Sequence, residues 1–237
     1  MTRTAAGSDV GRTRDHNEDD LLVTTVGDWT VLAVADGMGG HRAGDVASET
    51  ALDGFEAALD GRLDGADDVA ATLTAAVETA NDRVRAAATD GREGMGTTLV
   101  AAAVRDGEAT VVNVGDSRAY HVTETTIDRI TVDQSVVRNL IEEGVIDPEA
   151  ADDHPQRHVL AQALGTSDDV DPDVYDRSVR GTLLLCSDGL TEEVPESAIK
   201  AAVVDASLDG AVDRLVDAAN ENGGSDNVSV VLYRDPA

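Results

Sequence analysis

Four aspartates stand in glycine-containing turns, and three of them follow a run of apolar, strand-like residues. Side chains at the ends of separate strands can meet at one edge of a sheet. The arrangement therefore predicts a fold that delivers several carboxylates to one place. The four are Asp36 in VADGMGG, Asp116 in VGDS, Asp188 in CSDG and Asp226 in GSDN.

Crowded carboxylates need a counter-charge, and ligand sets made only of oxygen suit Mg²⁺ or Mn²⁺. Two alternatives follow: a metal-dependent hydrolase, or an acidic protein with many turns. Taken singly, Asp116, Asp188 and Asp226 have the composition of ordinary turn or helix-cap residues. The prediction of a metal site rests on the whole set and its order.

The chain carries 47 acidic and 18 basic residues, for a net charge of −29, and Lys200 is its one lysine. Such a surface repels polyanions, which argues against nucleic acid or an anionic membrane as a partner. Abundant aspartate with almost no lysine is typical of proteins from salt-loving archaea. Salt at about 1 M shortens the Debye length to about 3 Å and screens this repulsion. We therefore expect a halophilic archaeal protein; a repeller of acidic substrates or a calcium sponge is the alternative.

The chain has 237 residues, of which 41% are hydrophobic, so it can bury a substantial core. Its one cysteine, Cys186, excludes an internal disulfide and lies in an apolar run as a small buried residue. The amino-terminal residues lack an apolar signal region, and no stretch approaches 18 uninterrupted apolar residues. We expect a soluble, cytoplasmic protein.

The pattern of apolar residues predicts an α+β fold in one domain spanning residues 1–237. Hairpin signals at Gly27-Asp28 and Asp106-Gly107, and strands in meanders with grouped helices, favour antiparallel sheets over a parallel doubly wound fold. Both termini are expected to contribute strands to one core. Expected strands lie at 21–26, 29–35, 97–105, 109–114, 118–123, 128–131, 182–186 and 227–233; expected helices lie at 43–59, 67–89, 135–143, 157–164, 196–204 and 208–220, the fourth within an Asp/Pro-rich stretch at 146–176.

The turn after Asp36 contains three glycines, which allow close backbone approach. Asp36 can bridge two metals while the carbonyl of Gly37 ligates one; a simple glycine turn is the alternative. The glycines lack G-x-G-x-x-G spacing, and no Lys-Ser or Lys-Thr follows, which disfavours a nucleotide loop. Arg14 can hold a phosphate through its guanidinium fork, or it belongs to a solvated charged turn.

Other catalytic classes have weak support. The five histidines lack metal-ligand spacing, although His41 directly follows the glycine turn. No G-x-S-x-G nucleophile elbow is found, and Ser187 precedes an acid.

Taken together, six segments resemble the PP2C (PPM) family of metal-dependent protein serine/threonine phosphatases, in its microbial form. The matches follow the family order along nearly the whole chain. They are RDHNED at 14–19, VADGMGGH at 34–41, GMGTT at 94–98, VGDSR at 114–118, LCSDGLT at 185–191 and SDNV at 225–228.

The resemblance implies a four-layer αββα sandwich of two antiparallel sheets flanked by helices, and it implies a role for each matched residue. Asp36 would bridge two Mn²⁺ or Mg²⁺ ions and Gly37 would add its carbonyl. Asp188 and Asp226 would complete the shell of the first metal, and Asp19, with Glu18 nearby, would support the second. Asp116 with Asp188 would bind a possible third ion, and Arg14 would hold the substrate phosphate.

The implied mechanism is direct attack on phosphorus by a hydroxide that bridges two metals about 3.5–4 Å apart. No phosphoenzyme is needed, which agrees with the lack of a credible nucleophile. Met38 stands where animal members carry a histidine proposed as general acid, so His41 or a metal-bound water is left as proton donor. Asp133-Gln134-Ser135 replaces a frequent D-H-S, and a substrate-selecting flap is expected at about 131–165.

The expected substrates are proteins phosphorylated on serine or threonine, with an opposing serine/threonine kinase, and a monomer is expected. Two other functions compete with this interpretation. One is a non-catalytic family member, which typically loses metal aspartates; every matched aspartate is present here. The other is a structural role in which the acidic surface collects cations.

Overall fold

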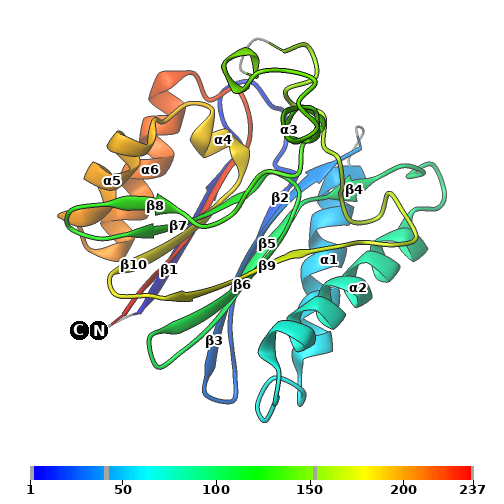
Figure 1. The fold of residues 1–237 in the computed structure, drawn as a ribbon, viewed down its shortest axis with the longest axis horizontal. Coiled ribbons are helices and arrows are strands. Elements are labelled where there is room, and N and C mark those ends of the chain that lie inside the picture. The colour runs from blue at the N-terminus through cyan, green and yellow to red at the C-terminus, as the bar shows by residue number, and fades with distance from the viewer. Residues whose placement is uncertain (1–2, 40–42, 152–153, 236–237) are drawn as a thin grey trace.

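In a computed structural model, which describes residues 3–39, 43–151 and 154–235, two antiparallel sheets pack face to face between two helical layers (Figure 1). The first sheet has the strand order β1-β11-β10-β7-β8 and the second has β2-β3-β5-β6-β9, with the short β4 paired to β3. The expected α+β fold and its four αββα layers are confirmed.

The strands of the first sheet are β1 (Thr4–Asp9), β7 (Arg118–Val122), β8 (Ile127–Arg129), β10 (Thr182–Cys186) and β11 (Val228–Arg234). Those of the second are β2 (Asp19–Val26), β3 (Trp29–Met38), β4 (Gly96–Thr97), β5 (Leu99–Arg105), β6 (Glu108–Val114) and β9 (Asp173–Ser178). The helices are α1 (Ala43–Leu59), α2 (Val69–Ala87), α3 (Val136–Glu142), α4 (Asp188–Thr191), α5 (Glu196–Val204) and α6 (Leu208–Asn222), with a 3-10 turn η1 (Pro148–Ala150).

Successive side chains of a strand point to opposite faces of its sheet. The central strands therefore contribute to three layers of core, one between the two sheets and one between each sheet and its helices. In β3, Val31 and Ala33 pack against α1 and α2, whereas Leu32 and Val34 pack between the sheets. The first sheet repeats this arrangement, with alternate residues of β11 facing α5 and α6. Both faces of these strands are buried, which explains why they read as nearly continuous apolar runs.

The two hairpin signals are confirmed. Val26 pairs with Trp29, leaving Gly27-Asp28 as a two-residue loop, and Arg105 pairs with Glu108 around Asp106-Gly107. In the described part of the chain, no helix is both long and apolar enough to cross a bilayer.

The Asp/Pro-rich stretch differs from expectation. The helix expected at 157–164 is wrong, because this backbone makes long-range bonds instead: Ala161 N donates to Gln134 O and Leu164 N donates to Thr97 O. Strand β9 was not expected, and it pairs with β6 along its whole length. The amino-terminal strand β1, for which the sequence suggests no range, pairs with β11.

Candidate metal centre

The two sheets bring their carboxylates to one edge of the sandwich. Asp19 and Asp36 lie opposite each other on β2 and β3 of the second sheet. Asp188 follows β10, and Asp226 precedes β11, in the first sheet. Ser187 connects the sheets, since its Oγ donates to Asp19 Oδ2 at 2.8 Å and accepts from Ser229 N at 3.0 Å.

The pKa of Asp36 shows that the predicted carboxylates converge. Burial raises this pKa well above its usual range, and four further negative charges raise it more. The contributing carboxylates, in decreasing order, are those of Asp19, Asp188, Asp116 and Asp226. Five aspartates that are widely separated in sequence therefore share one electrostatic environment.

Three neighbours of Asp36 have similarly raised pKa values. Burial, followed by the charge of Asp188, raises the pKa of Asp116 to about 7. Burial also raises the pKa of Asp19 to about 7, against hydrogen bonds from Ser229 and Ser187 that lower it. For Asp188, burial and the charge of Glu192 raise the pKa to about 6. The charge of Arg118 lowers the pKa of Asp116 only in part, so negative charge is in excess at the centre.

Orphaned oxygen atoms point to the same conclusion. Glu18 Oε1, Asp19 Oδ1 and Asp188 Oδ1 are buried and have no hydrogen-bond partner. A buried carboxylate oxygen without a partner is costly unless a cation or water completes it. Oxygen donors with excess negative charge are the set that Mn²⁺ and Mg²⁺ prefer, so the residues present fit these ions.

Thr98 and Gly37 hold Asp36 in place. Thr98 Oγ1 accepts from Asp36 N at 3.0 Å, and Thr98 N donates to Asp36 O at 2.9 Å. A Cβ on Gly37 would lie 2.1 Å from Gly44 O and 2.5 Å from Glu18 O. Only glycine therefore lets the start of α1 and the Glu18 backbone approach this strand.

The amino-terminal segment closes the rim of the centre. Arg14 Nη2 donates to Asp226 Oδ2 at 2.6 Å, and the Arg14 side chain is 47% exposed. Asn227 anchors the segment, because its Oδ1 accepts from Glu18 N at 2.8 Å and its Nδ2 donates to Val10 O and His16 O. The charged turn at Arg14 thus packs against the metal centre.

The carboxylates do not yet form a compact ligand set. Among the described residues, no three His, Cys, Asp or Glu side chains are grouped as a ready metal site. Two of the carboxylates have hydrogen-bond partners outside the cluster: Asp226 Oδ2 accepts from Arg14, and Asp19 Oδ2 accepts from Ser187. The remaining candidate, His41, lies outside the described residues.

Several residues that support the carboxylates lie within the family motifs without being candidate ligands themselves. Thr98, Ser187 and Asn227 lie in the GMGTT, LCSDGLT and SDNV segments, and all three are buried. Buried polar residues next to candidate ligands are typical orienting groups. Gln134, at the departure from D-H-S, has a similar role: its Oε1 accepts from Gly115 N at 3.0 Å and so supports the turn before Asp116.

Cys186 has the structural role expected of it. It is fully buried, and burial raises its pKa to about 12. A thiol with a raised pKa is not a nucleophile near neutral pH.

Known proteins are similar to this chain over nearly its whole length. The serine/threonine phosphatase stp of Listeria welshimeri is 39% identical over 235 residues, covering 95% of this chain and 92% of the relative. The crystal structure of the Mycobacterium tuberculosis serine/threonine phosphatase PstP/Ppp superposes with a TM-score of 0.89 at 38% identity, over 99% of each chain. A structure of the PstP catalytic domain in complex with two manganese ions gives a TM-score of 0.85 at 35% identity, over 99% of this chain and 98% of that one. The family model for protein phosphatase 2C matches residues 6–232, so the chain belongs to the protein phosphatase 2C family.

Proposed function

We propose that this protein is a metal-dependent phosphatase that hydrolyses phosphoserine and phosphothreonine in proteins. The observation that carries the proposal is the group of buried carboxylate oxygens without hydrogen-bond partners on Glu18, Asp19 and Asp188, beside Asp36, whose pKa is raised by burial and by the neighbouring carboxylates. The named relatives are serine/threonine phosphatases, and one was crystallised with two manganese ions. A non-catalytic relative would have no use for such a centre, because its charge destabilises the metal-free fold.

We assign the ligand roles from the family resemblance, on residues that the fold brings together. Asp36 lies among the other carboxylates and is placed to be shared by two ions, with the Gly37 carbonyl beside it. Asp188 and Asp226 would hold one ion, Asp19 with Glu18 would hold the other, and Asp116 with Asp188 would hold a third. When bound, Mn²⁺ or Mg²⁺ lowers the pKa of a water held between the ions and offsets charge on the phosphoryl group.

Residues of the chain position the substrate. Arg14 lies half-exposed at the rim and can turn its fork from Asp226 to the phosphoryl oxygens, where a bidentate guanidinium is well matched. Ser187 and Thr98 fix the carboxylates that face the phosphate. Met38 cannot donate a proton to the leaving group, so we keep His41 as the candidate donor from the chain.

Further proposals concern the domain organisation, the partners and the origin of the protein. The apolar layer between the two sheets supports one domain over residues 1–237. We propose a monomer that opposes a serine/threonine kinase. The net charge of −29 supports a halophilic archaeal origin and a need for salt.

The proposed function is tested by phosphate release from a phosphothreonine peptide with Mn²⁺, with a chelator, and with Asp188→Asn. Release is expected to require Mn²⁺ and to fall by at least about 100-fold in the variant. Asp217→Asn, which removes the same charge from the exposed face of α6, should keep full activity. Equal loss in both variants would favour diffuse cation collection by the acidic surface and overturn the assignment.

A further inference from the structure

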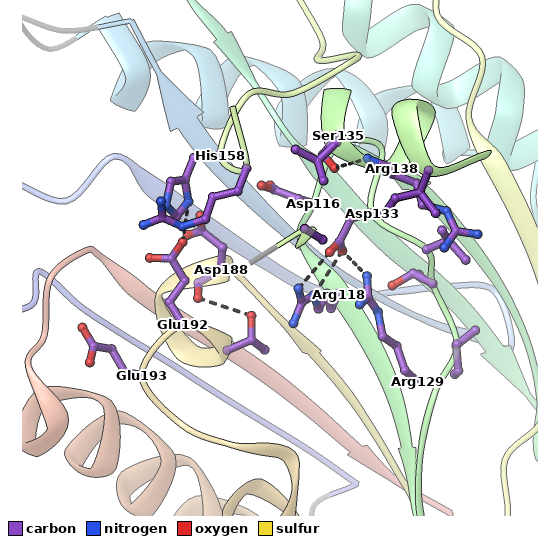
Figure 2. A pocket seen from close by; sticks show the side chains of 18 of the residues that line it. Asp116, Arg118, Arg129, Asp133, Ser135, Arg138, His158, Asp188, Glu192 and Glu193 are labelled. Carbon is purple, nitrogen blue, oxygen red and sulfur yellow. Dashed lines mark hydrogen bonds and ion pairs between the residues drawn. The ribbon is translucent and has the colours of Figure 1, made fainter. Parts of the chain in front are cut away.

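A cavity of about 750 Å³ opens beside the metal centre, with Asp116 and Asp188 on its wall (Figure 2). The cavity gathers basic residues, although the chain as a whole carries a charge of −29. Four of the 18 basic residues line it: Arg118, Arg129, Arg138 and Arg157. We call this cavity the arginine pocket.

Around Asp133 the arginine pocket holds two guanidinium groups for one carboxylate, whereas Asp116, Asp188, Glu192 and Glu193 line other parts of its wall. Arg118 makes a two-pronged contact with Asp133, with Nε–Oδ1 at 3.1 Å and Nη2–Oδ2 at 2.8 Å. Arg129 also donates to Asp133 Oδ1 (Figure 2). One carboxylate therefore balances only half of two guanidinium charges, and all three side chains are 21–29% exposed.

The outer part offers guanidinium groups that a ligand can recruit. Arg138, on α3, pairs with Glu142 one turn later at 2.8 Å, but both side chains are largely exposed, and such pairs hold weakly. Arg157 is exposed, and no ion pair to it is found within the described residues. Val137 adds a buried apolar surface to the same wall.

We propose that the arginine pocket is a substrate subsite that takes an acidic side chain, aspartate or glutamate, close to the phosphorylated residue of the target protein. This rests on the proposed function, because the pocket shares Asp116 and Asp188 with the metal centre and a bound peptide would pass directly from one to the other. Guanidinium forks match carboxylates bidentately. The negative surface elsewhere repels acidic segments, so the guanidinium groups of this pocket favour the docking of an acidic side chain here.

The test compares two phosphothreonine peptides, one with glutamate and one with glutamine at the three positions on each side. Assays use the lowest KCl concentration that keeps the protein folded, since salt screens exposed ion pairs. We expect kcat/KM with Mn²⁺ to be roughly three- to tenfold higher for the glutamate peptide. In Arg138→Gln/Arg157→Gln that ratio should fall toward 1, with Arg118 and Arg129 left in the pocket. Arg157→Glu should bring it below 1.

Arg214→Gln is the matched control, because it removes one exposed arginine from α6, outside the pocket, and should keep the wild-type ratio. Equal hydrolysis of both peptides by the wild type, or an undiminished preference in the double variant, would overturn the subsite while leaving the proposed function intact. Hydrolysis of neither peptide with Mn²⁺ would overturn the proposed function and the subsite with it.

Discussion

Arg14 donates a hydrogen bond from Nη2 to Oδ2 of Asp226 across 212 positions of the chain, at 2.6 Å. The contact joins the residue proposed to hold phosphate to a residue proposed to hold metal. In the metal-free protein Arg14 thus supplies one of the few positive charges that the centre has. A cation held by Asp226 would compete with this ion pair and would leave the Arg14 guanidinium free to bind a phosphoryl group.

Arg14→Gln should separate catalysis from metal binding. We expect kcat/KM on a phosphopeptide to fall roughly tenfold to hundredfold, because a bidentate donor to the phosphoryl group is lost. Mn²⁺ affinity should stay unchanged or increase, because Asp226 no longer has a competing partner. Calorimetric Mn²⁺ titration and peptide kinetics measure the two effects, with Arg12→Gln as the control for an exposed arginine nearby. Weaker Mn²⁺ binding in Arg14→Gln would contradict this account.

The pKa of Asp188 gives a prediction for the metal-free protein. Folding raises this pKa from 3.8 to about 6, so the folded state favours the protonated carboxyl. The stability that this preference provides is fully present below about pH 4 and is lost as the pH rises through about 6. In chelator, Asp188→Asn should therefore become more stable than the wild type, on the order of 1–3 kcal/mol at pH 8. The advantage should shrink toward pH 4.

Thermal unfolding from pH 4 to pH 8 measures this difference, at roughly 2–4 °C for each kcal/mol. Saturating Mn²⁺ should reverse the order, because the wild type then gains binding free energy that the variant lacks. Asp217→Asn serves as the exposed control and should show neither effect. A variant that is less stable than the wild type in chelator at pH 8 would refute the charge repulsion at the centre.

Gly37→Ala should disrupt both the fold and the metal centre. The added methyl group has to displace the backbone of Gly44 and Glu18, which is expected to cost at least about 2 kcal/mol. Gly61→Ala is the comparison: a Cβ there meets nothing within 4 Å, and its φ of 66° adds only backbone strain. That strain is about 1–2 kcal/mol, and Mn²⁺ binding should be retained. Urea unfolding measures the stability of both variants, and Mn²⁺ titration measures their metal binding. A larger loss of stability and of Mn²⁺ binding in Gly37→Ala than in Gly61→Ala would show that the steric clash, and not backbone strain alone, is responsible.

Salt should stabilise the fold, because a net charge of −29 repels itself in dilute buffer. Raising KCl from about 0.1 M to about 1 M shortens the Debye length from about 10 Å to about 3 Å. We expect the melting temperature to rise by several degrees, and more than it does in sucrose, which is excluded from the protein surface but screens no charge. An unchanged melting temperature across this range would contradict the halophilic proposal.

Local sequence signals account well for the long helices and for the tight turns. Helices α1 and α5 have the expected bounds, since their amphipathic pattern and the nearby breakers act within a few residues. Edge strand β9 was missed because its residues are mostly exposed and it is held by its pairing to β6. The helix expected at 157–164 does not form for a similar reason: long-range hydrogen bonds to Gln134 and Thr97 override the local helix propensity.

The candidate site likewise has one part that local sequence predicts and another part that depends on tertiary packing. Asp19 and Asp36 face each other because they are equally distant from the Gly27-Asp28 turn, so that pairing is contained in the hairpin itself. Asp19 and Asp36 come close to Asp188 and Asp226 only because the two sheets pack together, and local sequence patterns do not predict that packing. The family resemblance predicted that these four aspartates lie together. The arginine pocket was not foreseen, because Arg118, Arg129, Arg138 and Arg157 come from a strand, another strand, a helix and a loop.

The most direct test of the central claim is a calorimetric Mn²⁺ titration of the wild type and of Asp36→Asn in salt that keeps both folded. Since Asp36 lies among all the other carboxylates, we predict that the wild type binds at least two ions per chain and that the variant loses at least one of them. The same two proteins should differ in phosphopeptide hydrolysis by at least about 100-fold. Equal Mn²⁺ stoichiometry and affinity in both proteins would contradict a metal centre built around Asp36.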